Sequence, residues 1–154
     1  MLVHVTSSQD AVEIIPKQVE DLVRSLIDYK QITCHELSLH FVSREEISTL
    51  HEEHFGDPSP TDCITFPIDS PEEDTFYKVL GEIFVCPEVA LSYAKRHLVS
   101  FEEELSLYVV HGFLHLLGYD DITKQEREQM RKEEALCMEH LRNNHCLLHL
   151  PTPA

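Results

Sequence analysis

Hydrophobic and polar positions along the chain predict four strands and five helices. Alternating or β-rich segments, which are typical of strands, cover residues 1–7, 35–42, 63–68 and 82–86. Helical periodicity runs from Val12 to Tyr29, with Pro16 tolerated only near the first turn. The pattern favours an α+β domain with a mixed sheet of about four strands and with helices packed mainly on one side.

Start signals place the remaining helices. Ser43, Ser100 and Thr123 are each followed three residues later by a glutamate, which is the spacing of a capping box. Pro87 occupies a first-turn position before a helix over residues 89–98. The helix that follows Ser100 is apolar at most positions and is expected to be central, and the helix after Thr123 is expected to reach about His140.

The central helix carries a candidate metal site. His111 and His115 are four residues apart, so both imidazoles leave the same helix face. Gly118 ends the helix, because glycine accepts the left-handed conformation that reverses the chain, and Asp121 can then fold back toward the histidines. Three protein ligands with one open position are what a catalytic zinc requires. We predict one Zn²⁺, or another divalent transition metal, per chain.

A histidine pair on a helix can also be a hydrogen-bonded core pair or two surface residues. Here most positions between Leu105 and Leu117 are apolar, and a buried imidazole needs a partner that this helix does not supply. His145 and His149 have the same spacing in the C-terminal segment, with no third ligand beside them, so we interpret that pair as incidental.

Length and composition indicate one domain over residues 1–142, followed by a flexible tail over residues 143–154. The chain has 154 residues, of which 42% are hydrophobic, enough for one substantial core. We expect a cytoplasmic protein with no membrane partner, because no secretory signal is visible and no segment approaches the roughly 18 apolar residues of a membrane span. The five cysteines lack a C-x-x-C pair and indicate free thiols.

The formal charge of −16 argues against a general nucleic-acid binder, since phosphate contacts normally come from a basic surface. The acidic residues cluster, however, at residues 69–74, 102–104 and 126–139. A local positive cleft can therefore be formed by the metal and a few basic residues. An acidic face also suits a basic partner, although the default function of such a face is solubility.

The histidine motif resembles a known family. The segment His111-Gly-Phe-Leu-His-Leu-Leu-Gly-Tyr-Asp-Asp121 is similar to the signature H-G-x-L-H-L-x-G-Y-D-H of the YbeY family of bacterial endoribonucleases. Upstream, Pro60-Thr-Asp-Cys-Ile-Thr-Phe-Pro67 resembles P-T-D-V-L-S-F-P, and Leu80-Gly-Glu-Ile-Phe-Val-Cys86 resembles L-G-D-I-x-I-x. The resemblance covers roughly residues 35–140, and the histidine block is its most specific part.

Two residues depart from the family pattern. Asp121 stands where the family has a third histidine, and Phe55 stands where it usually has an arginine. A carboxylate binds zinc at about the same distance as an imidazole, but it makes the ion a weaker Lewis acid and admits iron, manganese or nickel more readily. Phenylalanine cannot make a bidentate phosphate contact. By elimination, the replacement candidates are Arg44, Lys78, Lys95 and Arg96.

The resemblance implies a single-strand-specific endoribonuclease that matures small-subunit ribosomal RNA and acts in ribosome quality control. It implies metal ligation by His111, His115 and Asp121, with His111 in the catalytic centre. Candidate partners are ribosomal RNA, a small-subunit ribosomal protein and a ribosome-assembly GTPase. Glu82, Asp62 or Asp120 could orient a ligating histidine from behind, although Asp62 and its neighbour in the P-T-D motif could instead only build a turn.

Two other functions stay open. A zinc peptidase of the H-E-x-x-H type is disfavoured, because Gly112 occupies the position of the glutamate general base. A non-catalytic ribosome-associated binding module is the stronger rival, because both departures from the family pattern fall on functional positions.

Overall fold

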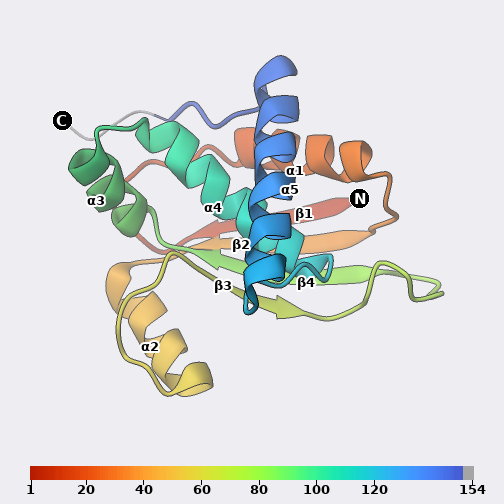
Figure 1. Ribbon diagram of the computed structural model, residues 1–154, viewed down its shortest axis with the longest axis horizontal. Helices are drawn as coiled ribbons and strands as arrows, with labels where there is room; N and C mark the ends of the chain where they lie inside the picture. Colours follow the sequence, from red (N-terminus) through yellow and green to blue (C-terminus); the bar gives the residue numbers. More distant parts are fainter. Residues whose placement is uncertain (151–154) are drawn as a thin grey trace.

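A four-stranded mixed sheet forms the centre of the protein in the computed structural model, which describes residues 1–150 (Figure 1). The strands are β1 (Leu2–Ser7), β2 (Glu36–Phe41), β3 (Cys63–Pro67) and β4 (Val79–Val85). Their order across the sheet is β1-β2-β4-β3. β1, β2 and β4 run parallel, whereas β3 pairs antiparallel with β4 at the edge. The predicted mixed sheet is confirmed.

Five helices accompany the sheet: α1 (Pro16–Lys30), α2 (Arg44–Phe55), α3 (Pro87–His97), α4 (Phe101–Leu116) and α5 (Lys124–Asn143). α1 packs on β1, and α4 packs on β3 and β4. α5 forms an outer layer across α4 and α1, and α3 packs against α4 (Figure 1). The α+β class and the central place of the histidine helix are thereby confirmed.

The two faces of the sheet carry different helices. Ile83 and Thr65 face α4, where they lie close to the backbone of Gly112. The residues that alternate with them, Ile64 and Phe84, belong instead to a second apolar cluster with Ile47 of α2. Because successive strand residues point to opposite faces, α2 packs against part of the sheet face opposite α4.

The predicted helix starts hold at four of five positions. Ser43 and Thr123 form complete capping boxes, and the Ser100 hydroxyl accepts from the amide of Glu103. Pro87 is in the first turn of α3. The predicted start at Val12 is wrong, because α1 begins at Pro16. Proline has no amide hydrogen to contribute to an inner turn, so it occupies the first position.

The C-terminal segment packs on the domain, although the sequence predicts a flexible tail from residue 143. Leu148 and Leu150 are buried in the core. The amide of Leu148 donates to the buried hydroxyl of Ser106 at 3.0 Å, and the amide of His149 donates to Gln18 Oε1 at 2.7 Å. Burial of these two leucines stabilises the packing of the segment on the domain. Residues 151–154 lie outside the described part of the chain.

Within residues 1–150, no helix is both long and apolar enough to cross a membrane. All five cysteines carry free thiols, as predicted.

Candidate metal centre

α4 brings His111 and His115 to one side of the domain near its C-terminal end. The helix is largely buried, and both histidine side chains are nearly four-fifths buried. Their rings lie edge to face, with the two Nε2 atoms 3.0 Å apart. The four-residue spacing therefore directs both rings to one point, as predicted.

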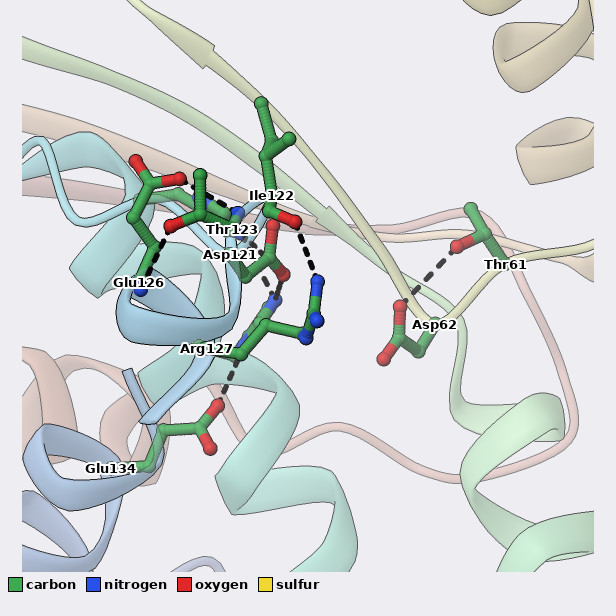
Figure 2. A network of polar contacts seen from close by, with 10 residues as sticks. Thr61, Asp62, Asp121, Ile122, Thr123, Glu126, Arg127 and Glu134 are labelled. Atoms are coloured by element: carbon green, nitrogen blue, oxygen red, sulfur yellow. Dashed lines mark hydrogen bonds and ion pairs between the residues drawn. The ribbon is translucent and has the colours of Figure 1, made fainter. Parts of the chain in front are cut away.

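A glycine turn returns the chain to this point. Gly118 has φ of +102°, its amide donates to the carbonyl of His115, and the Tyr119 amide donates to the carbonyl of Leu114. This pair of bonds is a Schellman motif, which ends the helix and reverses the backbone. Asp121 Oδ2 consequently lies 3.5 Å from Nε2 of both histidines. Figure 2 shows Asp121 between this turn and the start of α5.

The three side chains fit a zinc ion. Their ligand atoms all lie within 4.8 Å of one another, and this is the only such group among residues 1–150. In a tetrahedral site with metal–ligand distances of about 2.0–2.1 Å, neighbouring ligand atoms are about 3.3 Å apart. The separations of 3.0 and 3.5 Å bracket that value. The structure thus brings together all three residues that the sequence predicts as ligands.

Glu134 of α5 holds His111 from behind. The Nδ1 atom of His111 lies 2.6 Å from Oε2 of Glu134. Because a carboxylate can only accept, Nδ1 is the donor, and a neutral ring then keeps its lone pair on Nε2, toward Asp121. This is how ligating histidines are commonly oriented. Sequence reasoning missed Glu134.

The carboxylates around His111 favour positive charge. Burial lowers the pKa of His111, but the hydrogen bond that His111 donates to Glu134 and the charges of Glu134, Asp62 and Asp121 outweigh burial and raise the pKa above its usual value. The same electrostatic condition attracts a divalent cation.

The three predicted orienting residues have other surroundings. Glu82 lies 3.0 Å from Nε2 of His40, and within residues 1–150 no hydrogen bond or ion pair joins it to His111, His115 or Asp121. Asp62 lines a cavity with His111 and Asp121, but its Oδ1 accepts from the Thr61 hydroxyl at 3.3 Å (Figure 2). Asp120 is exposed and lines a different cavity, beside His115. Within residues 1–150, none of the three hydrogen-bonds a ligating histidine.

Two cavities adjoin the ligand set. A cavity of about 360 Å³ is lined by His115, Asp121 and Phe55, so Phe55 lies beside the candidate ligands. A cavity of about 220 Å³ on the other side is lined by His111, Asp121, Arg127 and Arg131. The ligand atoms are therefore reachable from two directions.

The replacement cations named by elimination do not line either cavity. Arg44 donates to Glu88 at 2.8 Å and to Ser92 at 3.0 Å, and Lys78 is buried with its Nζ atom on the carbonyl of Pro71. Lys95 and Arg96 lie in the last turn of α3. The two arginines of the smaller cavity were missed, because they lie in the acidic segment over residues 126–139.

Gly112 occupies the position of a peptidase general base and faces the sheet. A Cβ atom there would lie 2.6 Å from Cγ2 of Ile83 and 2.8 Å from Sγ of Cys63. Any longer side chain would enter the core rather than the ligand cluster. A glutamate at this position therefore has no route to the site.

The second histidine pair is separate from this centre. His149 lies 3.0 Å from Glu102, with its side chain 85% exposed. Among residues 1–150, neither it nor His145 joins a group of three potential ligands.

Comparison with known proteins identifies the family of this chain. Residues 4–142 match the family described as Endoribonuclease YbeY. The Endoribonuclease YbeY of Protochlamydia amoebophila is 39% identical over 142 residues, covering 92% of this chain and 94% of that protein. The Endoribonuclease YbeY of Chlamydia pneumoniae is 40% identical over 151 residues, covering 95% and 94%.

A solved structure has a similar fold. The solution structure of TM1509 from Thermotoga maritima matches with a TM-score of 0.60 and 30% sequence identity, covering 94% of this chain and 95% of that one. The family resemblance predicted from the histidine motif is therefore confirmed, and the chain belongs to the YbeY family.

Proposed function

We propose that this protein is a metal-dependent endoribonuclease that cleaves single-stranded RNA, matures small-subunit ribosomal RNA and acts in ribosome quality control. The observation that carries the proposal is the convergence of His111, His115 and Asp121 at spacings that suit zinc. The names of its relatives support RNA cleavage.

The ligands and the catalytic centre coincide in this proposal. His111, His115 and Asp121 hold one Zn²⁺ per chain, or another divalent transition metal, and Glu134 fixes the ring of His111. A divalent ion here would supply Lewis-acid chemistry, activating water and polarising the phosphate. His111 is the ligand we place in the catalytic centre, because it adjoins the cavity that contains Arg127 and Arg131.

The acidic surface determines how the substrate is delivered. With a formal charge of −16, most of the protein repels RNA, so binding depends on a local cleft at the metal. A basic small-subunit ribosomal protein or a ribosome-assembly GTPase would then direct the enzyme to its substrate. Because ribosomal RNA is the proposed substrate, we place its action in the cytoplasm.

Metal content tests the ligand set. Inductively coupled plasma mass spectrometry on the tag-free protein should give about one ion per chain. His111→Ala, His115→Ala and Asp121→Ala should each lose that ion, whereas the double variant His145→Ala/His149→Ala should keep it. A wild-type protein without metal after reconstitution would contradict the proposal.

Nuclease assays separate the enzyme from a binding module. The reconstituted protein should cleave a single-stranded RNA and spare casein, and the His111→Ala variant should not cleave the RNA. Ribosome association that survives His111→Ala and His115→Ala, in a protein without nuclease activity, would support the binding module instead.

A further inference from the structure

The smaller cavity beside the metal ligands combines acidic and basic side chains from four segments. Its volume is about 220 Å³. Asp62 precedes β3, His111 comes from α4, and Asp121 comes from the turn before α5. The two arginines and Glu134 come from α5. The charged and ligating residues are Asp62, His111, Asp121, Arg127, Arg131 and Glu134.

Arg127 and Arg131 occupy one face of α5, because they are four residues apart. Nη1 of Arg127 donates to the carbonyl oxygen of Ile122 at 2.5 Å, which ties this guanidinium to the turn that carries Asp121 (Figure 2). A guanidinium has five donors, so Arg127 retains others for a ligand. Arg131 has no hydrogen-bond or ion-pair partner among residues 1–150.

The balance of charge in the cavity depends on these two residues. Asp62, Asp121 and Glu134 carry three negative charges, and a divalent ion would leave one net negative charge, which repels a phosphodiester. With Arg127 and Arg131 the cavity carries one net positive charge. The arginines therefore decide whether a phosphate can approach the ion from this side.

We propose that Arg127 and Arg131 bind a backbone phosphate of the RNA strand at the metal centre. Arg131 can contact two phosphate oxygens at once through its planar guanidinium, and Arg127 is held in place by the carbonyl of Ile122. This inference rests on the proposed function and specifies which residues of this acidic chain contact the substrate backbone.

Arg131→Gln tests the assignment, with Lys132→Gln as the matched control. Both residues are exposed on α5, and both substitutions remove one positive charge, but only Arg131 lines the cavity. Binding of a fluorescent single-stranded 2′-O-methyl RNA is measured by anisotropy with zinc-reconstituted protein over a series of salt concentrations. Arg131→Gln should weaken binding about 10-fold and reduce the slope of log Kd against log salt by about 0.7, the value for one phosphate contact on a single strand.

Arg127→Lys is a second variant that preserves the charge. A lysine can still donate to the carbonyl of Ile122, but it lacks the planar arrangement of donors. Binding should weaken by less than in Arg131→Gln, with an unchanged salt slope. Metal content and Tm are measured on every variant, and they should match those of the wild type.

The outcomes distinguish this assignment from the proposed function. Equal affinities and salt slopes for Arg131→Gln and Lys132→Gln, in a wild type that binds and cleaves RNA, would overturn the phosphate site and leave the nuclease intact. Loss of metal from Arg131→Gln would also overturn the assignment, since the arginine would then support the ligands. A metal-loaded wild type that neither binds nor cleaves RNA would refute the proposed function, and the phosphate site with it.

Discussion

Removing the carboxylate behind His111 should weaken metal binding without removing a metal ligand. Glu134 accepts from Nδ1 of His111 at 2.6 Å, which leaves Nε2 free to face the ion. In Glu134→Ala the ring can rotate or adopt the other tautomer, with its proton on Nε2. In Glu134→Gln the amide oxygen can still accept the same hydrogen bond, but the negative charge is lost.

The structure gives the expected magnitude. A distance of 2.6 Å is short even for a charge-assisted bond, and the side chains of His111 and Glu134 are only 22% and 17% exposed. A hydrogen bond to a charged group contributes about 1.5–3 kcal/mol, and 1.4 kcal/mol corresponds to about a tenfold change in affinity. Glu134→Ala should therefore bind zinc about 10- to 100-fold more weakly, which is the usual effect of losing such a partner. Glu134→Gln should lose about half of that free energy, because a charge-assisted hydrogen bond is roughly twice as strong as a neutral one.

The assay is competition with a chromophoric zinc chelator, and Glu128→Gln is the control. Glu128 is exposed on the same helix, so its substitution makes the same change in net charge away from the ligands. Circular dichroism should show that all variants remain folded. If Glu134→Ala binds zinc within about twofold of the wild type, the hydrogen bond does not orient His111 for a metal, and the reasoning is wrong.

Three further substitutions test the scaffold, each by thermal or urea unfolding. Gly112→Ala should lower the free energy of unfolding, because the new Cβ atom would lie 2.6 Å from Cγ2 of Ile83. Such overpacking costs about 1–3 kcal/mol, which exceeds the gain of about 1 kcal/mol in helix propensity. A Tm at or above that of the wild type would contradict this packing. Thr123→Ala removes the α5 cap, with an expected loss of about 1 kcal/mol and about 2–4 °C in Tm. Ser106→Ala leaves the buried amide of Leu148 unpaired and should cost about 1–3 kcal/mol, so unchanged stability would mean that the C-terminal segment does not pack there in solution.

Local sequence signals predicted most of the fold. Capping at Ser43, Ser100 and Thr123 depends only on residues within one turn, and all three signals hold in the structure. Strand alternation identified the four strands for the same reason, although β4 begins at Val79 rather than Glu82. Gly81 explains the missed boundary, because a glycine weakens a strand pattern in the sequence. In the structure this glycine is needed, since a Cβ atom on residue 81 would lie 2.5 Å from the backbone carbonyl oxygen of Phe66.

Packing between distant segments was harder to predict. Terminal position suggested a flexible segment after residue 143, but Leu148 is buried, and the segment is hydrogen-bonded to Ser106 of α4 and Gln18 of α1. Position in the sequence does not show whether such a buried site exists for a terminal segment. Burial and backbone hydrogen bonding decide such cases, and both come from tertiary structure.

In the candidate site too, residues close together in the sequence were easier to predict than residues from distant segments. His111, His115 and Asp121 lie within eleven residues, so helix geometry and one glycine turn were enough to bring them together. Glu134 comes from another helix, α5. Its position within the hydrophobic periodicity of that helix is a sequence signal that could have identified it. Met130, Cys137 and Leu141 are buried on α5, and Glu134 falls on the same face at four residues after Met130.

A carboxylate on the buried face of an amphipathic helix requires a partner, because its desolvation is otherwise too costly. The largely buried histidines of α4 require partners for the same reason. In the structure these two requirements meet in the contact between Glu134 and His111, and α5 also carries Arg127 and Arg131, one turn apart, into the cavity beside that contact. The acidic net charge of residues 126–139 hid the two arginines from sequence reasoning, because a net charge is an average over all faces of a helix.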